Sequence, residues 1–317
     1  MKTLLLFIFC FLAVHCFAQI GEYSQKTALA VETYAYLKGQ QSALKKISSE
    51  FPGLHDDVLS VQKNIDLYHG RSQRNIELFL KEEFSEQYFL QLTKHLDSMI
   101  TQQLKNPIER EKYAEDLLDK IHKKIRSGTI GTTDKGILSF AYHDRPHQEL
   151  TDGHTINYST KGHPKAEESV VKIPVPKSWT AEEAEHPDTI QQFTSYAGKG
   201  DEKILLMIYQ LAESERNMLL TKESVYDFIA PQSVLIRSEK VTIDGIPGVM
   251  AEIEEVIDFA VNQKKVRMLQ FMFIHQQKLY CLQGSVGPAP IHHDLGLQLR
   301  KYEPLFRLVA QGTDIMN

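Results

Sequence analysis

The stretch VKIPVPKSW, residues 171–179, marks a change from helical to strand-like sequence. Its apolar residues Val171, Ile173 and Val175 alternate with lysine and proline, which is the period of a strand with one buried face. Because Pro174 has no backbone N–H to donate to a ladder, we expect this strand to lie at a sheet edge or to offer its proline side to solvent. An open edge there can accept a strand from a partner.

More strands follow this stretch. The run KILLMIYQL, residues 203–211, is continuously apolar, which predicts a central strand covered on both faces. Four further strand-like runs lie between residues 233 and 286, joined by loops too short for a crossover helix, so we expect an antiparallel meander. We also expect a short helix over residues 221–230 and a last helix over residues 295–310.

The first half of the chain has helical periodicity. From about residue 22 to residue 126 apolar positions recur three and four residues apart, as in Val58, Val61 and Ile65. Ser85 has the side chain of a helix N-cap. The pattern predicts a bundle of four or five helices with short connections, and the bundle is a second candidate partner surface. Self-association through the bundle is an open alternative, and the sequence leaves the oligomeric state undetermined.

Helices on both sides of a block of antiparallel strands indicate an α+β fold. We expect a signal peptide over residues 1–18, a helical bundle over 19–130, a linker over 131–167 and an α+β domain over 168–317.

The C-terminal half resembles the PsbP-like domain superfamily, which also occurs within exported bacterial proteins. The resemblance rests on IPVPKSW at residues 173–179, Phe193, the turn at residues 243–248, KLYCLQG at residues 278–284, and Phe306 in the last helix. It covers about residues 168–312 and implies an antiparallel sheet sandwiched by helices. It also implies a non-catalytic binding or assembly module.

The first 18 residues have the pattern of an export signal. Lys2 precedes an apolar run, and Ala18 precedes a cleavage position before Gln19. The run is shorter than the roughly 20 residues that span a bilayer, although an uncleaved anchor is the competing interpretation. We therefore expect a periplasmic or extracellular protein that is not integral to the membrane after cleavage. Cleavage would leave Cys281 as the only cysteine, which we expect to be buried.

The charge of the chain argues against nucleic acid as a partner. The formal net charge is −5 at pH 7, and neither half has the excess of Lys and Arg that a phosphate backbone demands. A protein in the cell envelope or extracellular space is the partner class that we expect.

Four of the 13 histidines, His143, His147, His154 and His163, lie close together in the expected linker. Imidazoles are suitable ligands for zinc and other transition metals. However, Pro146 separates the first two histidines, and the chain has no HExxH or CxxC pattern. We therefore assign no catalytic residue, metal or cofactor, and we predict an exported, non-catalytic binding or assembly module. A metal-dependent hydrolase or metal-binding protein that uses these histidines is the alternative.

Overall fold

A computed structural model of the chain describes residues 24–127, 130–166, 168–184, 188–215, 218, 220–258 and 263–316, with the side chains of residues 64, 66–68 and 124–127 excepted. The expected signal peptide over residues 1–18 lies outside the described residues. The chain divides into two compact units, Met1–His143 and Asp144–Asn317.

The N-terminal unit is helical, as predicted. Its described helices are α2 (Gln25–Glu50), α3 (His55–Glu83), α4 (Glu86–Gln103), α5 (Glu111–Ser127) and α6 (Thr132–Ala141), with a 3-10 turn, η2 (Pro52–Leu54), between the first two. The predicted cap at Ser85 is confirmed, because its hydroxyl oxygen accepts a hydrogen bond from the backbone N–H of Tyr88 at 3.2 Å.

Helices α2, α3 and α5 share one apolar core, and α6 packs against α2 and α3. The α6 contact is close because Gly136 has no side chain: a Cβ there would lie 2.5 Å from the Thr33 hydroxyl oxygen. The Asn75 side-chain amide also donates to the Phe140 carbonyl at 2.8 Å, which joins α3 to α6. The shared core of α2, α3 and α5 contains Leu44, Ile47, Val58, Val61, Ala114 and Leu118.

The segment expected to be a linker, residues 131–167, is folded along most of its length. It contains α6 in the first unit, then α7 (His147–Thr151), β1 (Thr155–Ser159) and the 3-10 turn η3 (Pro164–Ala166) in the second. The boundary between the units falls after His143. Glycine at position 136 lowers helix propensity, which explains why α6 is hard to see in the sequence.

The C-terminal unit contains two antiparallel sheets, which confirms the α+β prediction. The smaller sheet has the order β1-β2-β10 and the larger β3-β4-β5-β9-β8-β7-β6. Strands β6 to β9 form the predicted meander, and β5 is a central strand, as the run KILLMIYQL predicts. The new strands are β2 (Val170–Pro176), β3 (Thr180–Glu182), β4 (Thr189–Thr194), β5 (Lys203–Gln210), β6 (Val234–Ile243), β7 (Ile246–Asp258), β8 (Gln263–His275), β9 (Lys278–Pro290) and β10 (Asp314–Met316).

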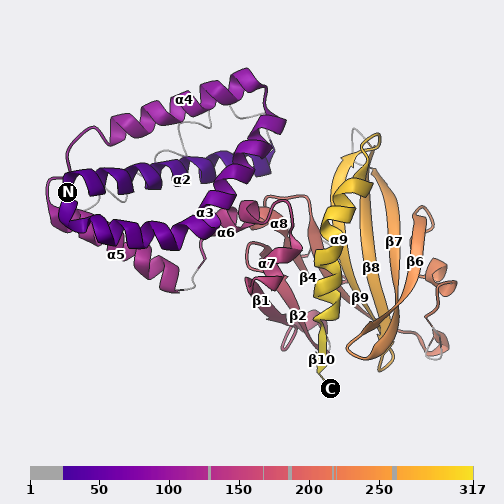
Figure 1. The fold of residues 1–317 in the computed structure, drawn as a ribbon. Coiled ribbons are helices and arrows are strands. Elements are labelled where there is room, and N and C mark those ends of the chain that lie inside the picture. Colours follow the sequence, from indigo (N-terminus) through magenta and orange to yellow (C-terminus); the bar gives the residue numbers. More distant parts are fainter. Residues whose placement is uncertain are drawn as a thin grey trace. The chain divides into compact units, whose positions relative to one another are not determined.

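Helix α9 (Leu295–Gln311) lies across one face of the larger sheet, over β8 and β9 (Figure 1). A Cβ at Gly284 on β9 would overlap the ring of Phe306, so the absence of a side chain there lets the helix approach the strand. Trp179 is buried in the same core and meets Tyr302 of α9 edge-on, with ring centroids 6.5 Å apart.

The opposite face of the sheet is covered by the segment between β5 and β6 rather than by the α-helix expected over residues 221–230. That segment contains the 3-10 turns η4 (Glu213–Glu215) and η5 (Ser224–Asp227), and Val225 is fully buried in the core on this face. Cys281 belongs to this core, which confirms that it is buried, and burial raises the pKa of its thiol to about 12. The thiol therefore stays protonated near neutral pH.

In the part of the chain that the structure describes, no helix combines the length and the apolar character of a membrane span.

Gly284→Ala is expected to lower the free energy of unfolding of the C-terminal unit by about 1–3 kcal/mol, because the added methyl group displaces the Phe306 ring. Trp179, the only tryptophan, lies in this unit, so its fluorescence during urea unfolding reports the change. The matched control is Gly70→Ala in α3, where an added Cβ meets nothing within 4 Å. This substitution should stabilise the helix by about 0.5–1 kcal/mol. Equal Trp179 transitions in wild type and Gly284→Ala would contradict the prediction.

Candidate functional site

The prediction that the strand containing Pro174 offers an open sheet edge is wrong. Strand β2 is the middle strand of its sheet, where Pro174 pairs with Asn157 of β1. On the other side β10 pairs only with residues 170–172, so no ladder bond is required from the proline nitrogen. Gly312, just before β10, fills the position beside Pro174: a Cβ on it would lie 2.7 Å from the proline Cγ.

The larger sheet ends in β3 on one side and β6 on the other, so its open edges are at these strands. Strand β3 has 3 residues, whereas β6 has 10. We use the name "β6 edge" for the side of Val234–Ile243 that faces away from β7. Among the described residues, the backbone groups along this side pair with no further strand, so the β6 edge is the longest surface available for strand addition.

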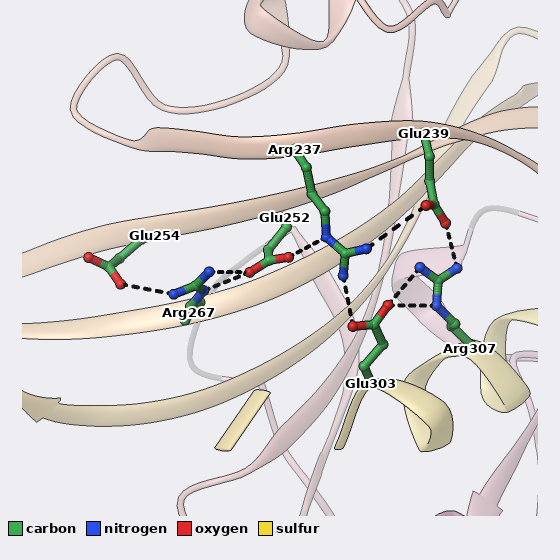
Figure 2. A network of polar contacts seen from close by, with 7 residues as sticks. All are labelled: Arg237, Glu239, Glu252, Glu254, Arg267, Glu303 and Arg307. Carbon is green, nitrogen blue, oxygen red and sulfur yellow. Dashed lines mark hydrogen bonds and ion pairs between the residues drawn. The ribbon is translucent and has the colours of Figure 1, made fainter. Parts of the chain in front are cut away.

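A carboxylate on β7 holds β6 and β8 together from between them (Figure 2). Glu252 is 6% exposed, and its two oxygens accept from Arg237 Nε on β6 at 2.5 Å and from Arg267 Nε on β8 at 2.7 Å. The register explains the contact, because Glu252 is the direct partner of Arg237 and is two residues from Glu254, the partner of Arg267, so that it lies on the same face of the sheet. These charge-assisted bonds fix β6 in one register on β7.

A second carboxylate connects β6 to α9. Glu303 accepts from Arg237 Nη2 at 2.7 Å and from Arg307 Nε at 2.8 Å. Arg307 in turn donates from Nη1 to Glu239 of β6 at 2.5 Å. Side chains of β6, β7, β8 and α9 thus form one ion network, comprising Arg237, Glu239, Glu252, Glu254, Arg267, Glu303 and Arg307 (Figure 2).

The hydrogen bonds of the network favour the charged forms of Arg237 and Glu303. Hydrogen bonds to Glu303 and Glu252 raise the pKa of the Arg237 guanidinium. Burial acts to raise the pKa of Glu303, but hydrogen bonds from Arg237 and Arg307 outweigh burial and lower it below its ordinary value of 4.5. An ionised carboxylate between guanidinium groups is poorly suited to proton transfer near neutral pH. The chemistry of the network is therefore that of a clamp and not of an acid–base pair.

Apolar side chains are exposed at one end of the β6–β7 pair. Val234 is 58% exposed, and Ile236 is 45% exposed at the register irregularity between Leu235 and Arg237. Val256 and Ile257, at the adjoining end of β7, are also exposed. The sequence shows alternating charges in the stretch of β6, but the ion pairs depend on strand register and on the position of α9, neither of which a single sequence reveals.

The four candidate metal ligands are divided between the two units of the chain. The ring of His143 lies near Phe140 and Phe79 in the N-terminal unit, with centroids 6.2 Å and 5.8 Å apart, whereas the other three histidines lie in the C-terminal unit. Burial is the main cause that lowers the pKa of His154. His163 Nδ1 accepts from the backbone N–H of Lys165 at 3.3 Å. His147 begins α7.

Within the described ranges, no three His, Cys, Asp or Glu side chains are grouped so that they could hold a metal ion.

No protein-family model matches the chain, and no curated protein matches it in sequence.

Solved structures do match, over about half of the chain. Cyanobacterial PsbP (CyanoP) from Synechocystis sp. PCC 6803 is 16% identical, with a TM-score of 0.34, over 51% of this chain and 93% of that protein. The Ran-binding protein Mog1p from Saccharomyces cerevisiae is 10% identical, with a TM-score of 0.34, over 51% of this chain and 96% of Mog1p. LpqN from Mycobacterium tuberculosis, described as involved in cell envelope biogenesis, is 13% identical, with a TM-score of 0.32, over 53% of this chain and 95% of LpqN.

The matching structures include a PsbP, the superfamily that the sequence resemblance names. At these identities and TM-scores the neighbours carry no argument about ligand, partner or activity.

Glu252→Gln is expected to lower the free energy of unfolding of the C-terminal unit by about 2 kcal/mol, because Arg237 and Arg267 lose the carboxylate between them. The expected loss of stability is smaller than for a fully buried ion pair, because the Arg237 side chain is 40% exposed. Glu254→Gln is the matched control on the same strand. The nearest ion-pair nitrogen to the Glu254 carboxylate is Lys265 Nζ at 3.6 Å, so this substitution should lower the free energy of unfolding by less than about 0.5 kcal/mol. Urea unfolding followed by Trp179 fluorescence tests both, and equal effects would refute the role of Glu252.

Acid is expected to weaken the contact between α9 and β6 through Glu303. Because its pKa is lower in the folded state than in the unfolded chain, its contribution to stability is present above the unfolded pKa and is lost as the pH falls through the folded pKa. Urea unfolding at about pH 7 and about pH 4 should therefore show a smaller loss of stability in Glu303→Gln than in wild type. The same loss in both proteins would show that Glu303 does not contribute.

Proposed function

We propose that this protein is an exported, non-catalytic binding module whose C-terminal unit takes up an extended segment of a partner protein along the β6 edge. In this mode the partner adds a strand to the sheet. Its backbone hydrogen bonds supply affinity, and side chains at alternate positions supply specificity.

The proposal rests on the observation that charged side chains of β6 are paired with charged side chains elsewhere in the fold. Charged side chains along an edge strand normally discourage pairing with another chain. Of the three charged residues of β6, Arg237 and Glu239 are engaged by Glu252, Glu303 and Arg307, which leaves Lys240 outside the network. The first half of the edge therefore offers exposed Val234 and Ile236 without an unneutralised charge beside them.

The rigidity of the strand also favours binding. Strand β6 is joined by charge-assisted bonds both to β7 and to α9, so its backbone is ordered before a partner arrives. Preorganisation reduces the conformational entropy lost on association. Export is supported by the leader-like residues 1–18, and it places the partner in the cell envelope or the extracellular space.

Placing a lysine on the edge is expected to abolish partner binding while leaving the fold intact. Val234→Lys and Ile236→Lys each add an unpaired charge at an exposed position, where substitutions usually change stability by less than about 0.5 kcal/mol. The tagged protein and both variants would be recovered from the envelope and medium of the native host, and co-purified proteins quantified by mass spectrometry. A partner recovered with wild type should be lost from both variants.

The control is Leu297→Lys, which adds the same charge at a leucine of α9 that is 67% exposed. It should retain the partner. Hydrogen exchange of the purified complex should then show protection of β6 amides. Retention of the partner by both edge variants, with protection in α2 to α6 instead, would refute the β6 edge and assign binding to the helical bundle.

A further inference from the structure

A small pocket opens in the C-terminal unit at the end of β5, far along the sheet from β6. It lies among η3, β4, β5 and the start of β9, and it has a volume of about 340 Å³. This volume is within the range of small-molecule sites. The residues that give the pocket its polar character are Lys165, Asp188, Tyr209, Gln210 and Lys278.

Two ammonium groups reach this pocket from different elements. Lys165 on η3 donates from Nζ to the Thr189 carbonyl at 3.2 Å, which uses one of the three donors of its ammonium group. Lys278, at the start of β9, donates from Nζ to the Ser169 hydroxyl oxygen at 2.9 Å. These bonds position both side chains at the pocket by contacts to the protein itself.

Asp188 is the one further charged side chain among the lining residues that the structure describes, and the others are neutral or apolar. Burial, aided by the proximity of Cys281 and Asp188, raises the pKa of Tyr209 to about 12, so its phenol is uncharged near neutral pH. Ile190 of β4 and Ile208 of β5 supply apolar surface. The described residues that line the pocket thus carry two ammonium groups and one carboxylate, which is one positive charge in excess.

We propose that this pocket binds a small organic monocarboxylate. The ligand carboxylate interacts with Lys165 and Lys278, and its short apolar part lies against Ile190 and Ile208. One excess positive charge matches a monoanion, and charge-assisted hydrogen bonds from ammonium to carboxylate are among the stronger polar contacts in proteins. A phosphate dianion would leave one negative charge uncompensated in the pocket, and it has no apolar part to contact Ile190 and Ile208. This site is separate from the β6 edge and does not depend on it.

The test is isothermal titration calorimetry of the purified protein at low ionic strength. The probes are short monocarboxylates from acetate to valerate, 2-hydroxy acids such as lactate, and inorganic phosphate. A carboxylate should bind with one-to-one stoichiometry, and Lys165→Gln should weaken it at least about tenfold, because a charge-assisted hydrogen bond is lost. Lys278→Gln should have a similar effect. Lys222→Gln, at an exposed lysine away from the pocket, should leave affinity unchanged.

Several outcomes would overturn the proposal. These are no binding of any carboxylate at millimolar concentration, binding of phosphate alone, or carboxylate binding that survives both pocket substitutions. Lys165 is exposed and its side chain bonds only to a carbonyl among the contacts above, so Lys165→Gln decides the matter even where Lys278→Gln lowers the stability of the protein. Trp179 fluorescence during urea unfolding checks the folding of each variant.

Discussion

The ring of Phe306 lies directly against the backbone of β9 at Gly284, with no side chain between the helix and the strand. This contact sets the depth at which α9 lies on the sheet, and Phe306 and Leu305 are both buried there. Because residues three and four apart share a face of a helix, the same depth sets how far Glu303 and Arg307 reach from the side of α9 toward β6. The apolar contact thus determines whether Glu303 and Arg307 can join the ion network, since a hydrogen bond from Arg237 to Glu303 needs a distance near 3 Å, and 2.7 Å is found.

The network contributes more to uniqueness than to net stability. Removing Glu252 from water costs free energy that its two guanidinium partners largely offset, and apolar residues of similar size could replace such a group without loss. What apolar residues could not do is distinguish one register from another. A shift of β6 by one residue would turn Arg237 to the opposite face of the sheet, away from both Glu252 and Glu303. The charges therefore fix the register of β6 on β7 directly after the irregularity at Ile236.

The parts of this fold that the sequence predicts are those that depend on local periodicity. Alternation in VKIPVPKSW and short loops after residue 233 predict the strands and their antiparallel order, and three-to-four spacing predicts α2 to α5. Tertiary contacts explain the errors. Helix α6 contains Gly136, a poor helix former that is needed because Thr33 of α2 lies so close. Pro174 favours an edge strand, yet it lies in a middle strand. It is tolerated there because β10 pairs with β2 only over residues 170–172 and does not reach the proline. The ion pairs join residues 15 and 66 positions apart, beyond any local pattern.

The β6 edge and the carboxylate pocket lie on one sheet without sharing a residue. Strands β9, β8 and β7 separate β5 from β6, so the two sites are about 19 Å apart at roughly 4.8 Å per strand. Groups at this separation with no common partner act additively on stability and binding. Coupling between them would require an element with two arrangements, and the sheet core between them is closely packed on both faces. On both proposals, occupancy of the pocket should therefore leave the β6 edge unchanged, and a small anion and a partner strand would bind independently.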